Sequence, residues 1–289
     1  MGFSIKEMTF KERYLLYLTE KELAGPWFSF KLKRKDLGTV PVILKNIEPT
    51  PIYQLVNSRK GANLDRITLD FDIREYIKRL VNENKLKPIE FKNKKHFVRL
   101  YIDVFLRRGH APYMNTYFTL KNNSDFDLID FSMIFIFDFD INGLEGFNND
   151  LSGYDEENDI IYQYDNTEVY AGFSTISRST NYESCLTRDF KFGEGNLSLS
   201  NTLHEGPGEI LSALQIRFKT LEPGHSFQTA LTISGGFSKE LLFENIKLGK
   251  INAVKQLGQV NRSVKSEQRN IQEEAFLKIN QQEAEGCND

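Results

Sequence analysis

An alternating apolar run that ends in an acidic loop constrains the fold of this chain more than any other feature. Residues 129–155 read IDFSMIFIFDFDINGLEGFNNDLSGYD. One set of alternate positions is apolar throughout, namely Phe131, Met133, Phe135, Phe137 and Phe139. On the other face, Ile134 and Ile136 are followed by Asp138 and Asp140. Strict alternation over this length predicts a β-strand in a packed sheet.

Further alternating segments favour an all-β body. The chain has 289 residues with 23 Phe and 12 Tyr, and aromatic richness is typical of sheets. Turn residues separate the segments, as in Asn122-Asn123-Ser124-Asp125. Glu222-Pro223-Gly224-His225 is expected to join Leu211–Leu221 to the next strand as an antiparallel hairpin. The pattern predicts a mainly β fold, a sandwich of two antiparallel sheets with peripheral helices at both termini.

Helical patterns lie at both ends of the chain and once inside it. Residues 4–23 carry apolar side chains at helical spacing before Gly25-Pro26, which predicts an N-terminal helix. Asp70–Asn84 predicts an internal helix, and Ser238–Lys250 predicts another with Ser238 as its N-cap. We therefore expect an N-terminal helical segment (1–24), a β-sandwich domain (25–236) and a C-terminal helical segment with a polar, partly disordered tail (237–289).

Composition and motifs exclude several classes of function. The net charge of −3 gives no basic surface for nucleic acid, and no run of 18 apolar residues predicts a membrane span. The sequence contains no phosphate-binding loop, dinucleotide fingerprint or nucleophile elbow. The chain has two cysteines far apart in sequence, Cys185 and Cys287, and these make neither a disulfide framework nor a metal knuckle. The N-terminus lacks the apolar core of a signal peptide, so we expect a cytoplasmic location.

The order of features between Asn115 and Lys250 resembles the N-terminal β-sandwich domain of prokaryotic glucoamylase-like glycoside hydrolases. A strand ending in Asn-x-Ser (YFTLKNNS) precedes the long apolar strand and the loop NNDLSGYD. The segment VYAGFS follows, and LQIRFKTLEPGHSFQTALTISGGFSKELL then carries two strands joined by Pro-Gly, the ISGG sequence and a linker helix. Such domains belong to the large sandwiches, or supersandwiches, that galactose mutarotases also have. The resemblance covers about half of the chain.

The resemblance implies a carbohydrate-associated sandwich but carries over no catalytic residue. The hydrolases continue into a helical barrel that bears two catalytic carboxylates, whereas this chain ends at residue 289. Mutarotases use His and Glu in the sandwich groove as acid and base. None of the four histidines here aligns with such a motif; they are His96, His110, His204 and His225.

The acidic loop opens in the D-x-D-x-N-G order of a calcium loop. Calcium takes roughly six to eight oxygen ligands, and Asp150 could add to those of Asp138, Asp140 and Asn142. The twelfth position is Asn149 instead of the usual Glu, and a strand instead of a helix precedes the loop. The alternative is a strand end followed by an Asn142-Gly143 turn. We expect no cofactor other than a structural calcium ion at Asp138, Asp140, Asn142 and Asp150.

Two further constellations could carry chemistry or bind a ligand. His204 and Glu205, before Gly206-Pro207-Gly208, could form an acid–base pair, or the segment could be an exposed turn whose adjacent side chains point apart. The rings of Tyr154, Tyr162 and Tyr164 could stack on the C–H faces of a sugar. The alternative is that these tyrosines only cover the faces of a sheet.

Two function hypotheses follow. The first is a non-catalytic binding or scaffolding protein that recognises a glycan or a protein partner, with neither nucleic acid nor membrane as a partner. The alternative is a mutarotase-like or sugar-epimerase-like enzyme, which needs a His beside a Glu or Asp in a concave site. The C-terminal helical segment could in addition join copies of the chain into a homo-oligomer.

Overall fold

The computed structural model describes residues 7–10, 13–17, 25–35, 38–44, 53–59, 64–91, 96–105, 112–141, 146, 148–190 and 198–258. Most of these residues form two antiparallel sheets. The strands of the larger sheet are β5 (Tyr53–Arg59), β6 (Leu64–Asp72), β7 (Phe97–Phe105), β8 (Tyr113–Asn123), β10 (Leu151–Asp155), β11 (Ile160–Tyr164), β12 (Tyr170–Thr175) and β15 (Ser226–Gly236). Those of the smaller sheet are β3 (Gly25–Arg34), β4 (Gly38–Leu44), β9 (Asp127–Asp138), β13 (Asn181–Leu186) and β14 (Ile210–Leu221).

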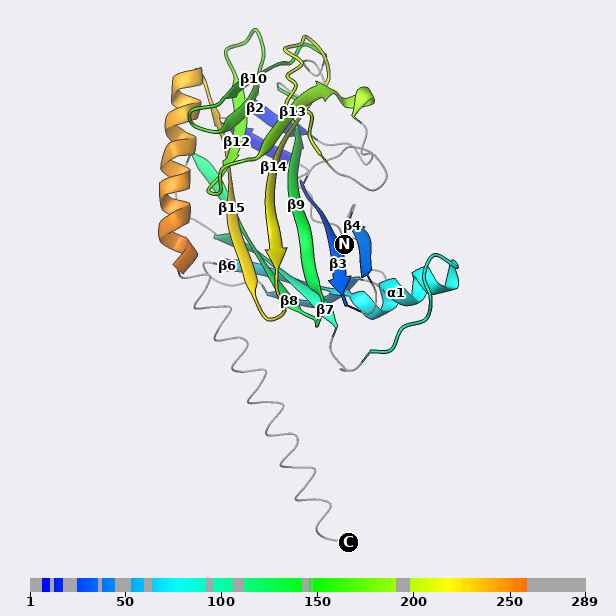
Figure 1. Ribbon diagram of the computed structural model, residues 1–289. Helices are drawn as coiled ribbons and strands as arrows, with labels where there is room; N and C mark the ends of the chain where they lie inside the picture. Colours follow the sequence, from blue (N-terminus) through cyan, green and yellow to red (C-terminus); the bar gives the residue numbers. More distant parts are fainter. Residues whose placement is uncertain are drawn as a thin grey trace.

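The two sheets face each other as a sandwich (Figure 1). The eight-stranded sheet has the order β10-β11-β12-β15-β8-β7-β6-β5, and the five-stranded sheet has the order β13-β14-β9-β3-β4. Aromatic rings make contacts between the sheets. Phe118 of β8 lies 5.2 Å from Phe135 of β9, and Phe173 of β12 lies 4.8 Å from Phe137, measured between ring centroids. The predicted two-sheet antiparallel sandwich is confirmed.

Strand β9 supplies the centre of the core, as its alternation predicts. Phe131, Met133, Phe135 and Phe137 are fully buried between the sheets. On the opposite face of β9, Ile134 and Ile136 join a smaller apolar cluster with Trp27, Leu199, Leu211 and Ala213. The five-stranded sheet is therefore covered on both faces at this end, which explains why β9 is apolar at every position from Met133 to Phe137.

Two α-helices lie outside the sandwich in the described part of the chain. Helix α1 (Ile73–Asn82) begins at Asp72, whose Oδ1 accepts hydrogen bonds from the backbone N–H groups of Arg74 and Glu75. The helix over residues 239–258 (orange in Figure 1) lies along the outer face of the larger sheet. The hydroxyl of Ser238 caps it by accepting from the N–H of Leu241 at 3.1 Å. Both helices were predicted from sequence, and neither is long and apolar enough to cross a membrane.

The predicted N-terminal helix over residues 4–23 is wrong, because strands β1 (Glu7–Phe10) and β2 (Arg13–Tyr17) form an antiparallel pair there. Met8 and Phe10 alternate with polar residues, and β2 contains Tyr14 and Tyr17, so β-propensity outweighs an imperfect helical spacing. Strands β5, β6, β10 and β13 were also not expected.

The segment Glu222–His225 is a turn, as predicted, but it does not join two neighbouring strands of one sheet as a hairpin would. Gly224 has a φ of +79°, as a tight turn after Pro223 requires, but β14 and β15 belong to different sheets. The turn between β8 and β9 also crosses between the sheets. Buried Asn122 connects the two turns, because its Nδ2 donates to the carbonyls of Phe126 (2.7 Å) and Leu221 (3.0 Å).

Candidate functional site

The register of β10 and β11 places the three predicted sugar-stacking tyrosines, Tyr154, Tyr162 and Tyr164, on two different faces of the sheet. Gly153 pairs with Tyr162, and Tyr154 pairs with Ile161, so Tyr154 and Tyr162 point to opposite faces. Tyr162 packs under the C-terminal helix, where its ring lies 5.5 Å from that of Phe243. Tyr164 is on the same face as Tyr162 and stacks on Tyr170 at 5.1 Å. The three predicted tyrosines therefore do not form one surface.

Tyr154 instead meets a tyrosine that the sequence analysis did not select. Its ring stacks on that of Tyr182, from β13, with centroids 3.9 Å apart and planes at 19°. Both rings are half-buried and belong to a surface hollow of about 340 Å³, here called the tyrosine hollow. It is lined by Tyr154, Glu156, Arg178, Ser179, Thr180, Asn181, Tyr182 and Asn201. The hollow combines a paired aromatic surface with amide, guanidinium and carboxylate groups.

Hydrogen bonds fix the walls of the tyrosine hollow. The hydroxyl of Tyr154 donates to Oδ1 of buried Asp159 at 2.9 Å, and the other carboxylate oxygen of Asp159 accepts from the N–H of Ser179 at 2.8 Å. Burial is the main reason that the pKa of Tyr154 is raised to about 12, and the charge of Asp159 adds to it. Asn201 accepts from the N–H of Tyr182 at 3.0 Å. The ring pair is thus held in place before any ligand arrives.

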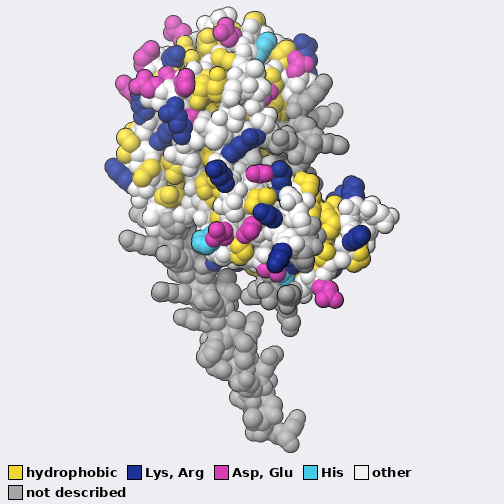
Figure 2. Space-filling view, in the orientation of Figure 1, with side chains coloured by type: hydrophobic (Ala, Val, Ile, Leu, Met, Phe, Trp, Pro, Cys, Tyr) yellow, Lys and Arg dark blue, Asp and Glu magenta, His cyan; other side chains and the backbone are white. Residues whose placement is uncertain are grey.

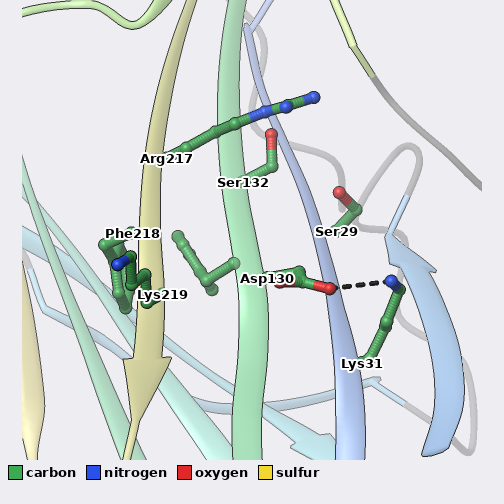
Figure 3. Close-up of a pocket in the computed structure, with 8 residues that line it drawn as sticks. Ser29, Lys31, Asp130, Ser132, Arg217, Phe218 and Lys219 are labelled. Carbon is green, nitrogen blue, oxygen red and sulfur yellow. Dashed lines mark hydrogen bonds and ion pairs between the residues drawn. The ribbon is translucent and has the colours of Figure 1, made fainter.

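A second hollow, here called the basic hollow, lies on the outer face of the five-stranded sheet (Figure 3). Its volume is about 410 Å³, and it is lined by Ser29, Lys31, Asp130, Phe131, Ser132, Arg217, Phe218 and Lys219. Strands β3, β9 and β14 contribute these residues. Figure 3 shows Arg217 extending from β14 across β9, past Ser132, while Lys31 pairs with Asp130 at 2.7 Å.

The acidic residues predicted to bind calcium come together in the interior. Asp138, Asp140 and Asp150 are all buried, and both carboxylate oxygens of Asp150 lack a hydrogen bond of normal geometry. Burial, followed by the charges of Asp140, Asp138 and Asp165, raises the pKa of Asp150 to about 10. Asn142 lies outside the described residues. The described part contains no group of three or more His, Cys, Asp or Glu side chains arranged to hold a metal ion, so calcium here stays a prediction.

The histidines lie away from both hollows in the part of the chain that the structure describes. His204 is held through its backbone, whose N–H donates to Ser184 Oγ at 2.9 Å, and no ion pair joins its side chain to exposed Glu205. His96 is buried with Nδ1 2.7 Å from Oδ1 of Asp125, and exposed His225 lies 3.8 Å from Glu222. His110 lies outside the described residues. The proposed acid–base role of His204 and Glu205 stays a prediction.

Comparison with known proteins identifies similar solved structures. No family model and no curated protein matches the chain. A bacterial glucoamylase complexed with acarbose is similar over 81% of this chain and 28% of its own, with a TM-score of 0.43 and 11% identity. Galactose 1-epimerase from Lactobacillus acidophilus NCFM is similar over 81% and 89%, with a TM-score of 0.42 and 10% identity. A polysaccharide lyase is similar over 78% and 28%, with a TM-score of 0.44 and 10% identity.

The glucoamylase and the galactose 1-epimerase correspond to the two groups of proteins, glucoamylase-like hydrolases and galactose mutarotases, that were named from the sequence. The chain spans less than a third of the length of the glucoamylase and of the lyase.

Proposed function

We propose that the protein is a carbohydrate-binding protein that holds a neutral sugar in the tyrosine hollow and catalyses no reaction there. The observation that carries the proposal is the rigid Tyr154–Tyr182 pair at the wall of a polar hollow. Aromatic rings offer an apolar face to the C–H groups of a sugar, and the surrounding polar groups can exchange hydrogen bonds with its hydroxyls. Asn181, Asn201 and Glu156 supply such groups.

The ionisable groups of this hollow favour binding over catalysis. The lining residues include Glu156 and Arg178 but no histidine. The hydroxyl of Tyr154 donates to Asp159, and burial moves its pKa further above the physiological range than that of an ordinary tyrosine. A mutarotase-like reaction needs a base and an acid on opposite sides of the sugar, and His is the usual residue that titrates near neutrality. The epimerase alternative therefore stays a second hypothesis, which a turnover assay on any bound sugar addresses.

A thermal-shift screen against neutral mono- and oligosaccharides tests the proposal. Binding to the folded state alone stabilises it by about 2.7 kcal/mol at a hundredfold excess of ligand over Kd, so a bound sugar raises the melting temperature. Tyr182→Leu keeps an apolar side chain but removes the stacking ring. We expect it to abolish the shift, whereas Tyr164→Leu, on the other face of the sheet, should retain it. No shift with any sugar, or an equal shift in both variants, would refute the proposal.

A further inference from the structure

The outer face of the five-stranded sheet changes from apolar to charged along its strands. At one end, Trp27, Ile134 and Leu211 are buried beneath the segment that contains Leu199. Farther along β14, the same alternate positions carry Arg217 and Lys219, which are both exposed. The basic hollow therefore begins where the apolar cover ends.

The basic hollow gathers positive charge on an acidic protein. Lys31, Arg217 and Lys219 line it with one carboxylate, Asp130, which leaves two net positive charges in a chain whose net charge is −3. Figure 2 shows several lysine and arginine side chains on the face in view, with acidic side chains among them. Lys219 forms no ion pair with any residue that the structure describes. Arg217 and Lys219 lie two positions apart on the same face of β14, and Lys31 lies on β3, beyond β9, where it pairs with Asp130.

A β-bulge shapes the floor of the basic hollow. The register between β3 and β9 shifts between Ser29 and Lys31, and Asp130 has a φ of +50°. The extra residue allows Leu128 and Phe131, three positions apart, both to be buried in the core. Asp130 is thereby placed on the outer face, 62% exposed and in contact with Lys31. Bulges are over-represented at sheet edges, at the rims of barrels and next to active sites, where they redirect a side chain.

We propose that the basic hollow binds an oxyanion, a carboxylate, sulfate or phosphate group, carried on a hydroxyl-bearing molecule such as an acidic sugar. The guanidinium of Arg217 offers parallel donors that match two oxygens of such a group, and Lys219 adds a point charge. Ser29 and Asp130 lie at the same hollow and can bond to hydroxyls. This site is separate from the tyrosine hollow and does not depend on the function proposed for it.

Calorimetric titration of the intact protein tests the proposal. Glucuronate, its neutral counterpart glucose, inorganic phosphate and inorganic sulfate are titrated separately into the wild type, Arg217→Gln and Lys247→Gln, at constant ionic strength set with chloride. Lys247 is an exposed lysine on the C-terminal helix and is the matched control for the loss of one charge. We expect glucuronate to bind the wild type, the affinity to fall at least about tenfold in Arg217→Gln, and Lys247→Gln to behave as the wild type.

The titrations with phosphate, sulfate and glucose show whether the bound anion is a free ion or part of an acidic sugar. If phosphate or sulfate alone binds and depends on Arg217, the hollow is an oxyanion site for a free ion. If glucuronate binds and glucose does not, the ligand is an acidic sugar. Equal affinity of the wild type and Arg217→Gln, or no binding of any of the three anions to the wild type, would overturn the proposal. Tyr182→Leu should leave anion binding unchanged, which separates this test from that of the tyrosine hollow.

Discussion

Asn122 is the residue on which both turns between the sheets depend. Its side-chain carbonyl accepts from the N–H and the hydroxyl of Ser124, and its backbone exchanges hydrogen bonds with the second turn at Gly224 and His225. The side chain is fully buried, so these polar groups have no access to water. A single asparagine thus fixes two chain reversals that lie about a hundred residues apart.

We predict that Asn122→Ala lowers the free energy of unfolding by about 2–4 kcal/mol. The substitution removes the amide hydrogen bonds and leaves the buried carbonyls of Phe126 and Leu221 without a side-chain donor, and each such loss costs about 1–3 kcal/mol. Urea unfolding measures the effect. Asn123→Ala is the control and should change stability by no more than about 0.5 kcal/mol. A loss as small as that of the control would show that Asn122 does not hold the turns.

Asp150 should make the protein less stable at neutral pH than in mild acid. Its raised pKa means that the folded state holds a proton that the unfolded state releases above about pH 4. Its contribution to stability is therefore greatest below about pH 4 and falls as the pH rises toward 10. We predict that Asp150→Asn, measured by urea unfolding with a chelator present, stabilises the protein by about 1–3 kcal/mol near neutral pH. The gain should shrink toward zero as the pH falls to about 4.

The calcium hypothesis predicts the opposite behaviour of the same variant. A bound divalent cation would neutralise Asp138, Asp140 and Asp150 without protons. Added calcium would then raise the melting temperature of the wild type, and Asp150→Asn would lose that rise and be the less stable protein in calcium. This outcome would contradict the account of Asp150 as a neutral carboxyl group.

At the scale of elements, the C-terminal helix is bound to the larger sheet through close contacts with small residues. A Cβ placed on Gly249 would lie 2.4 Å from the Thr232 methyl group and 3.0 Å from the ring of Tyr113. Thr232 cannot turn away freely, since it is buried and its hydroxyl donates to Asn115 at 2.8 Å. Asn115 in turn donates to the carbonyl of Gly249 at 3.0 Å. The helix therefore lies as close to β15 and β8 as a glycine allows.

The Gly249→Ala variant tests whether the cost of overpacking at this contact exceeds the gain in helix propensity. Ala in a helix interior is favoured over Gly by about 1 kcal/mol, but overpacking costs about 1–3 kcal/mol. We predict a net loss of about 1–2 kcal/mol in the free energy of unfolding for Gly249→Ala. Gly258→Ala is the matched control, because nothing lies within 4 Å of its added Cβ, and it should be neutral or stabilising. Stabilisation by both variants would mean that the helix does not pack on the sheet as described.

Elements with strong local periodicity were predictable from sequence, whereas the partners of each strand were not. The alternation of β9 and the Ser238 cap both appear as expected. The N-terminal hairpin was taken for a helix because a short apolar segment fits both periods. Of the two stacked rings of the tyrosine hollow, only Tyr154 was selected from the sequence, because Tyr182 comes from a strand of the other sheet. The stacking of Tyr154 on Tyr182 across the two sheets could not be predicted from the spacing of these residues in the sequence.

At the scale of the whole molecule, the tyrosine hollow and the basic hollow lie in the described part of the sandwich and differ in chemistry. The tyrosine hollow pairs an aromatic surface with amide groups, and the basic hollow carries an excess of positive charge. Binding at the basic hollow should weaken as salt is added, because charges exposed to solvent are screened. Binding of a neutral sugar at the tyrosine hollow should not. The central claim of this account is that the Tyr154–Tyr182 pair is where sugar binds.

Nuclear magnetic resonance of protein labelled in its tyrosine rings tests that claim most directly. The sugar that gives the largest thermal shift is titrated into the labelled protein, and the Tyr182 signal is assigned from its loss in Tyr182→Leu. Of the 12 tyrosines, we predict that Tyr154 and Tyr182 shift most, and that Tyr162, Tyr164 and Tyr170 stay unchanged beneath the C-terminal helix. Shifts confined to those three rings, or no change in any tyrosine signal on saturation with sugar, would contradict the account.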